Sequence, residues 1–294
     1  MGFQERLREA ERLRKHRDFQ RAEACYRSLL EEAPQHAEAL LGLADTLRGL
    51  GRPHQALAMW QTWLELHAPT APVLTRMGDA CRKTGQRAQA LQHYRKALRL
   101  APDHRSALMG LGDLYLRENK PDRALECWER LLALDPSLVS LHAQVGNLHR
   151  KRLAFEKAEA SFRAVLGLEP ENPYGLFGLA DVLRGQGRHV EAAPLWDAVL
   201  AVDPHNPQVL TRAGDCFARL GEAGKATRLF EQALTLGFHK PALLGLVRVA
   251  QDQGNHLEAL RRCQELLAHS PRDSRALALL ESLEAEHHAP PGKA

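Results

Sequence analysis

The sequence has few aromatic residues, scattered cysteines and no long apolar run. Of its 294 residues only 5% are aromatic, and its apolar runs are a few residues long. Since a membrane-spanning helix needs about 20 apolar residues, no membrane insertion is expected. The first residues also lack the apolar stretch of a secretory signal. The five cysteines are an odd number and form no CxxC pair, which predicts a reducing, cytoplasmic location.

The sequence also has little excess of one charge over the other. The chain has 40 lysines and arginines against 36 acidic residues, a net charge of +4. Residues 1–138 hold 22 basic against 18 acidic residues, while residues 139–294 hold 18 of each. Nucleic-acid-binding domains usually concentrate basic charge more strongly than this, so binding to DNA or RNA is not favoured. Apolar residues make up 44% of the chain, which is enough for a large core and excludes wholesale disorder.

Signatures of catalysis and of metal or cofactor binding are missing. The sequence contains no GxxxxGK[ST], GxSxG or HExxH motif. Its fifteen histidines are scattered, and His142 and His149 are seven residues apart rather than at the i,i+4 spacing of metal-binding helices. We therefore expect no enzyme activity, no cofactor and no metal site.

What the sequence does contain is a long-range repeat. Alanines recur every 34 residues, at Ala22, Ala56, Ala90, Ala124, Ala158, Ala192 and Ala226, and Ala259 follows after 33. Four residues after seven of these eight alanines stands an aromatic residue: Tyr26, Trp60, Tyr94, Trp128, Phe162, Trp196 and Phe230. Twelve residues after most of them stands a proline, and twelve residues before them a small residue. Such periodicity is typical of a repeat protein.

The spacing within one unit indicates two helices. Apolar residues at unit positions 4, 7, 8 and 11, for example Leu40, Leu43, Ala44 and Leu47, form the stripe of an amphipathic first helix. A turn that often contains glycine follows, then a second helix with the alanine and the ring, which the proline ends. No single unit can bury its stripe, so neighbouring units must stack.

This pattern resembles the tetratricopeptide repeat over nearly the whole chain. The resemblance implies an all-α fold: a right-handed α-solenoid superhelix of about eight helix-turn-helix units, followed by a C-terminal capping helix. The expected units are 3–36, 37–70, 71–104, 105–138, 139–172, 173–206, 207–239 and 240–273. Residues 274–288 are expected to form the capping helix and residues 289–294 a disordered tail.

A second period of 136 residues indicates a four-unit duplication, 3–138 against 139–273. Residues 40–52 match residues 176–188 at ten of thirteen positions, whereas the second helices that follow have diverged. Core packing explains only part of this retention, because retained residues also lie opposite the packed stripe. In tetratricopeptide proteins that side lines the concave groove of the superhelix, so we interpret the retained side as the binding face.

The predicted groove combines acidic, basic and apolar side chains. Carboxylates accept hydrogen bonds from peptide groups and arginines donate to carbonyl oxygens, which suits an extended peptide or a protein surface. The candidate partner-binding residues are Leu41, Asp45, Arg48, Thr75, Arg76, Asp79, Arg82, Met109, Asp113, Arg117, Asn147, Arg150, Tyr174, Phe177, Asp181, Arg184, Thr211, Arg212 and Asp215.

Two features of this groove have a second interpretation. Acidic residues at unit position 9 and arginines at position 12 lie three residues apart, so they could simply form salt bridges along one helix, worth about 0.3–0.5 kcal/mol each. Glycines recur at position 6 of alternate units, at Gly42, Gly110, Gly178 and Gly245. They indicate close approach either by a ligand backbone or by a neighbouring helix, since a helical glycine costs about 1 kcal/mol.

These observations predict a non-enzymatic scaffold or adaptor that binds a protein or an extended peptide. One alternative is a recruitment or regulatory subunit of a multi-protein enzyme complex. A less favoured one is nucleic-acid binding through the groove arginines, which a steep salt dependence would reveal. No unit has a lysine at position 5, so the carboxylate clamp of chaperone-binding tetratricopeptide domains is not expected. The sequence does not identify the partner or the oligomeric state.

Overall fold

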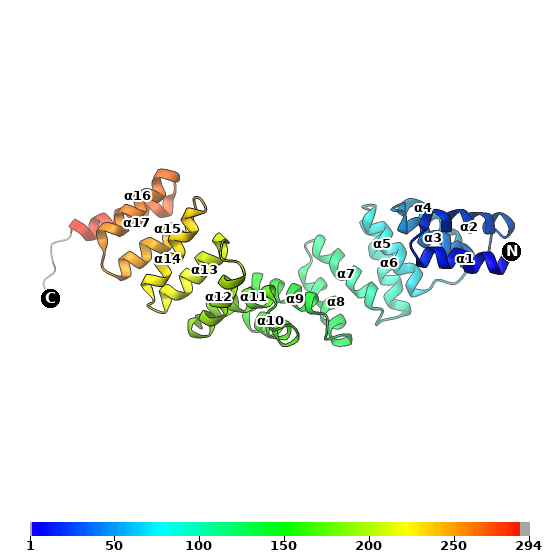
Figure 1. Cartoon of the computed structure of the whole chain (residues 1–294), viewed down its shortest axis with the longest axis horizontal. Coiled ribbons are helices and arrows are strands. Elements are labelled where there is room, and N and C mark those ends of the chain that lie inside the picture. Colours follow the sequence, from blue (N-terminus) through cyan, green and yellow to red (C-terminus); the bar gives the residue numbers. More distant parts are fainter. Residues whose placement is uncertain (1, 289–294) are drawn as a thin grey trace. The chain divides into compact units, whose positions relative to one another are not determined.

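The computed structural model describes residues 2–288, and every regular element in that range is an α-helix. The helices divide into two compact units, one ending at Pro136 and the other beginning at Ser137. Within each unit every helix packs against the next one along the chain (Figure 1). The expected all-α solenoid of stacked helix pairs is therefore confirmed. The predicted disordered tail, residues 289–294, lies outside the described residues.

Unit 1 consists of four helix pairs. Its odd-numbered helices are α1 (Phe3–Lys15), α3 (Ala37–Gly49), α5 (Ala71–Lys83) and α7 (Arg105–Arg117). Its even-numbered helices are α2 (Phe19–Glu32), α4 (Pro53–Leu66), α6 (Arg87–Leu100) and α8 (Pro121–Leu134).

Unit 2 consists of four helix pairs and one further helix. Its odd-numbered helices are α9 (Val139–Lys151), α11 (Pro173–Gly185), α13 (Pro207–Arg219) and α15 (Lys240–Asp252). The even-numbered helices are α10 (Phe155–Leu168), α12 (His189–Val202), α14 (Ala223–Thr235) and α16 (His256–His269). The last helix, α17 (Ser274–His288), packs on α16 and buries Ala276 and Leu283 completely.

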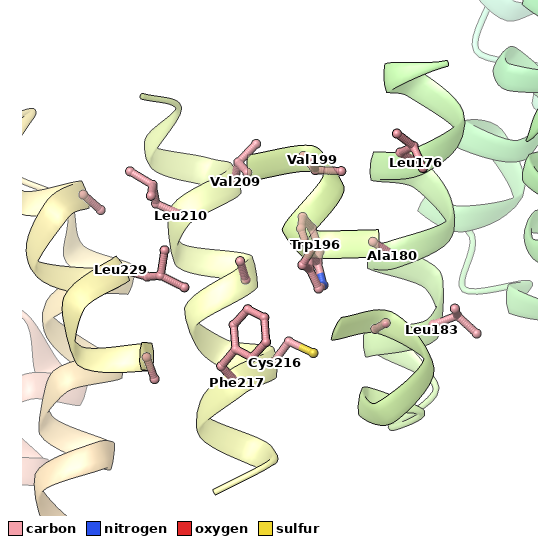
Figure 2. Close-up of a cluster of buried hydrophobic side chains, with 14 of the residues drawn as sticks. Leu176, Ala180, Leu183, Trp196, Val199, Val209, Leu210, Cys216, Phe217 and Leu229 are labelled. Atoms are coloured by element: carbon pink, nitrogen blue, oxygen red, sulfur yellow. The ribbon is translucent and has the colours of Figure 1, made fainter. Parts of the chain in front are cut away.

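The repeated alanines and rings form the core of each unit. All eight repeat alanines are fully buried, and the rings four residues later are at most 2% exposed. Figure 2 shows Trp196 of α12 between Ala180 of α11 and Val209 of α13. The small alanine lets two helices approach closely, and the ring fills the adjoining space.

The glycines at position 6 are explained by packing of these rings. A Cβ atom on Gly110 would lie 2.6 Å from the Tyr94 ring, and one on Gly178 would overlap the Phe162 ring. Gly42 and Gly245 stand in the same relation to Tyr26 and Phe230. Of the two interpretations of these glycines, close approach by a neighbouring helix is therefore the one that the structure shows.

The turn after each odd-numbered helix requires a left-handed residue. Glycine occupies this position after α3, α5, α11, α13 and α15, with φ between 70° and 80°. Arg17, Asn119 and Leu153 take the same conformation in the remaining turns, with φ of 62°, 56° and 57°. A residue other than glycine in this conformation costs about 1–2 kcal/mol of conformational free energy.

We expect Leu153→Gly to stabilise unit 2. Leu153 is 72% exposed, so its removal forfeits little burial, and glycine relieves the left-handed strain. After subtracting glycine's extra chain entropy, about 0.5–1 kcal/mol, the net gain should be about 0.5–1 kcal/mol in urea unfolding. Gly187→Ala is the matched reverse change, since no atom lies near its Cβ position, and it should destabilise. A loss of stability in Leu153→Gly would contradict this account.

None of the described helices is both long enough and apolar enough to cross a bilayer.

Candidate binding face

Neighbouring odd-numbered helices lie side by side within each unit. Contacts join α1 to α3 and α5 to α7 in unit 1, and α9 to α11, α11 to α13 and α13 to α15 in unit 2. Equivalent positions on successive odd-numbered helices are therefore adjacent in space. We call the surface that carries the candidate residues on these helices the odd-helix face.

In unit 2 this face is organised around Asp181, whose side chain is only 4% exposed. Arg150 of α9 lies 2.6 Å from Oδ2, and Arg184 of the same helix as Asp181 lies 2.8 Å from Oδ1. Arg212 of α13 pairs with Oδ2 as well. Burial alone would raise the pKa of Asp181, but Arg212 and Arg184 outweigh it and hold the pKa below its usual value. The carboxylate thus stays ionised and joins three helices.

Asp215 on α13 extends the same network. Arg184 Nη1 lies 3.2 Å from its Oδ2, and Arg248 Nη1 of α15 lies 2.9 Å from its Oδ1. Four arginines of unit 2 therefore share two carboxylates. A pocket of about 450 Å³ opens beside Arg184, Arg212 and Arg248, so this part of the face has an excess of positive charge.

An apolar pocket of about 580 Å³ adjoins the network in unit 2. It is lined by Tyr174, Phe177, Leu176, Val199, Val202 and Val209, with Asn147 and Asn206 among its polar groups. The Phe177 and Trp196 rings meet edge-on, with their centroids 5.6 Å apart. The Arg212 guanidinium lies 5.5 Å from the centroid of the Phe177 ring. Tyr174, which also lines this pocket, is 71% exposed. Gln208 lines both pockets, so an apolar and a cationic surface meet on one face.

The duplicated network in unit 1 is looser. Asp45 is nearly as buried as Asp181 and accepts one hydrogen bond from Arg76, at 2.8 Å. Arg14 and Arg48 stay 3.8 Å from its carboxylate oxygens, beyond hydrogen-bond distance. Equivalent residues are therefore present in both units, but three arginines contact Asp181 closely and only one contacts Asp45 closely.

The third and fourth helix pairs of unit 1 hold a separate group. Tyr94 donates a hydrogen bond of 2.6 Å to Asp79, and burial together with this carboxylate raises the pKa of Tyr94. Arg82 lies 3.7 Å from Asp79 and 3.9 Å from Asp113. Burial raises the pKa of Asp113, in spite of Arg82 and Arg117 nearby.

The remaining candidate residues differ in accessibility. Leu41 lines a pocket of about 340 Å³ with Asp45 and Arg76, Met109 is half-buried, and Arg117 is exposed. Asn147 accepts a hydrogen bond of 3.2 Å from Arg150. Thr75 and Thr211 are buried, and their hydroxyls donate to Ala71 and Pro207 of their own helices. The structure thus places most of the candidates at or near the surface, whereas the two threonine hydroxyls are already satisfied.

Several salt bridges of the odd-helix face join different helices. Arg184 and Asp181 do pair at the predicted i,i+3 spacing. Four close contacts of the odd-helix face, however, join residues 31 positions apart: Asp45 with Arg76, Arg150 with Asp181, Asp181 with Arg212, and Arg184 with Asp215. The charges therefore tie neighbouring repeats together.

A further pocket of unit 1 contains residues absent from the predicted site. Its volume is about 490 Å³, and Arg17, Phe19 and Lys83 line it together with Arg14, Lys15, Asp45, Arg48 and Gly49. The sequence contained a signal for it. Phe19 and Gly49 recur 136 residues later as Phe155 and Gly185, and in both units the ring occupies the space beside the glycine.

The buried cysteines offer no nucleophile on this face. Burial raises the pKa of Cys127 and of Cys216 to about 11, so both thiols stay protonated at neutral pH.

Comparisons with known proteins support the fold. A family model described as tetratricopeptide repeat matches residues 7–70, 75–139, 146–196 and 191–237. Among curated proteins, no sequence matches this chain.

Several solved structures are similar. The C-terminal part of a TPR repeat-containing protein from Cytophaga hutchinsonii is 16% identical, with a TM-score of 0.60, and the match covers 93% of this chain and 99% of that one. A tetratricopeptide repeat protein from Parabacteroides merdae is 17% identical, with a TM-score of 0.54, over 84% and 98% of the chains. PilW, a type IV pilus biogenesis factor, is 19% identical, with a TM-score of 0.55, over 71% and 98%. At these identities the likeness shows the fold alone.

Proposed function

The chain belongs to the tetratricopeptide repeat family, and we propose that it is a non-enzymatic scaffold that binds a protein or an extended peptide on its odd-helix face. Proteins of this fold generally serve as protein-interaction scaffolds. Within each unit, the odd-helix face would correspond to the concave side of the stacked repeats.

One observation supports this proposal most strongly: the apolar pocket of unit 2 adjoins its arginine network. Tyr174, Phe177 and Arg212 are of the residue types that most often dominate binding energy at protein interfaces. An apolar side chain of a partner would fill the pocket. The adjacent arginines would hold its main-chain carbonyls or carboxylates through charge-assisted hydrogen bonds.

Tyr174→Ala tests this proposal. The tyrosine side chain is exposed and belongs to no ion pair among the described residues, so its loss should leave the fold intact. If it is a binding hot spot, partner affinity should fall by about 1–2 kcal/mol, roughly fivefold to thirtyfold. The measurement is a quantitative capture from source lysate, followed by titration of the captured protein against both forms.

Val190→Ala on α12 is the matched control. The side chain of Val190 is 76% exposed, a fraction similar to that of Tyr174, but Val190 lies on an even-numbered helix. It should capture the same protein as the natural chain. Normal binding by Tyr174→Ala together with loss in Val190→Ala would place the partner on the even-numbered helices and overturn the proposal.

A further inference from the structure

The pocket of about 490 Å³ in unit 1 is unusually rich in cations. Five of its eight lining residues are basic, and one is acidic: Arg14, Lys15, Arg17, Arg48 and Lys83 against Asp45. They come from the ends of α1, α3 and α5 and from the turn after α1. Basic residues are common in the last turn of a helix, where they offset the helix dipole. That preference does not explain why three helix ends and a turn direct their cations to one pocket.

The carboxylates nearby neutralise only part of this positive charge. Asp45 accepts one hydrogen bond, from Arg76 outside the pocket, and lies 3.8 Å from both Arg14 and Arg48. Its Oδ1 atom is buried without a hydrogen-bond partner. Glu11 pairs with Lys15 at 2.9 Å and lies 3.9 Å from Arg14. Counting Glu11 with Asp45, five cations face two carboxylates, a net charge of +3. Within residues 2–288, Arg17 and Lys83 form no ion pair.

In unit 2 the basic residues at the duplicated positions are paired differently. Arg150, Lys151, Arg184 and Arg219 stand where unit 1 has Arg14, Lys15, Arg48 and Lys83. There, however, Arg150 and Arg184 are bound at 2.6 and 2.8 Å to Asp181, and Arg184 also reaches Asp215. Leu153 stands where unit 1 has Arg17. Arg150 and Arg184 of unit 2 thus contact Asp181 closely, whereas their counterparts Arg14 and Arg48 in unit 1 lie 3.8 Å from Asp45.

We infer that the basic pocket of unit 1 binds a local cluster of aspartate or glutamate side chains on the partner protein. The inference rests on the proposed function and names the chemistry of one part of the partner. Arginine and lysine side chains donate the charge-assisted hydrogen bonds that carboxylates accept. A volume of about 490 Å³ accommodates a few side chains.

The next pocket on the same face favours a local acidic cluster over a uniform polyanion. It shares Arg14 and Asp45 with the basic pocket, but it contains three carboxylates, Glu11, Glu38 and Asp45, against Arg14 and Arg76. A nucleic acid has a phosphate at every nucleotide and would meet net negative charge there. A peptide with a short acidic block followed by apolar residues matches both pockets, since Leu7 and Leu41 line the second one.

Arg17→Gly and Lys83→Gln test the inference without disturbing the core. Most other repeats have glycine at the position of Arg17, so the left-handed turn accepts it. The probe is a fluorescein-labelled peptide in which a block of glutamates precedes a block of leucine and glycine, titrated against the full chain by fluorescence anisotropy. Binding should be salt-dependent, and the double variant should weaken it about tenfold or more.

Leu153→Gly supplies the matched control. It makes the same backbone change at the duplicated position of unit 2 but removes no charge, so peptide binding should stay unchanged. A peptide of the same composition with its glutamates spread evenly should bind more weakly than the block peptide.

Two results would overturn the inference. The first is that the block peptide does not bind, or that it binds the Arg17→Gly, Lys83→Gln double variant as tightly as the natural chain. The other is tighter binding of a single-stranded DNA of equal charge that depends on these same two residues. If the captured partner still depends on Tyr174 while the basic pocket has no effect, the inference fails and the proposed function stands. If the partner depends on neither, the proposed function itself fails.

Discussion

Asp181→Asn is expected to destabilise unit 2 by about 3 kcal/mol or more. Removing one partner of a buried ion pair typically costs about 3–5 kcal/mol, because the remaining charge is left uncompensated. Here three arginines converge on one carboxylate. The NH₂ group of the Asn side chain would also face a guanidinium, and because both groups are hydrogen-bond donors, they cannot pair. The arginines are 20–33% exposed, so water relieves part of the loss and the effect should lie near the lower end of that range.

Asp45→Asn is the control, since it changes the duplicated residue in unit 1. Only one charge-assisted hydrogen bond is lost there, so about 1.5–3 kcal/mol is expected. Urea unfolding gives the total change, and amide hydrogen exchange assigns it to α9, α11 and α13 or to α1, α3 and α5. Equal effects of the two substitutions would contradict the tighter network of unit 2.

Acid titration provides a second readout of the same carboxylate. The pKa of Asp181 is lowered in the folded state, so its network adds stability above the unfolded pKa of about 3.9. This contribution is lost as the pH falls through the lower folded pKa. The natural chain should therefore lose stability in unit 2 below about pH 4, and Asp181→Asn should lack that part of the loss.

The helical repeat could be predicted from the sequence because its signals are local and recur. Alanine, ring and proline at fixed spacing each specify one physical requirement: close helix approach, a filled gap and a helix end. Ala124 and Trp128, for example, are buried as the repeat predicts. Eight repetitions of the same pattern left little room for another fold.

The role of the position-6 glycines could not be decided from one unit. A glycine in a helix indicates close approach but does not name the approaching group. The distinguishing signal lay in the preceding second helix. Gly178 follows Phe162 and Gly42 follows Tyr26, whereas Arg76 follows Trp60 at the same spacing. Position 6 thus alternates together with the ring that packs on it.

The pairing of charges was beyond sequence reasoning for a different reason. The composition of the face is readable, and Asp45 and Asp181 look equivalent in it. Which arginine lies at 2.8 Å and which at 3.8 Å depends on side-chain positions set by packing around each helix pair. Differences of this size separate a charge used within the fold from one available to a partner.

The second large effect is expected from Phe162→Ala, at about 3–5 kcal/mol. Phe162 of α10 is fully buried, and its ring lies against Gly146 of α9 and Gly178 of α11. Removing the ring leaves a cavity between three helices. Gly178→Leu alone should cost about 1–3 kcal/mol, because its side chain would enter space that the ring occupies.

Combined, the two substitutions should partly compensate each other. The leucine on α11 would fill the cavity left by Phe162, so the double variant should be more stable than the sum of the single effects by about 0.5–3 kcal/mol. Phe162→Ala with Gly245→Leu is the control within unit 2. Gly245 faces the ring of Phe230, so that pair should be additive. Urea unfolding of all variants measures both cycles. Equal coupling in the two cycles would mean that the position-6 glycines respond to general crowding and not to the ring that packs on each of them.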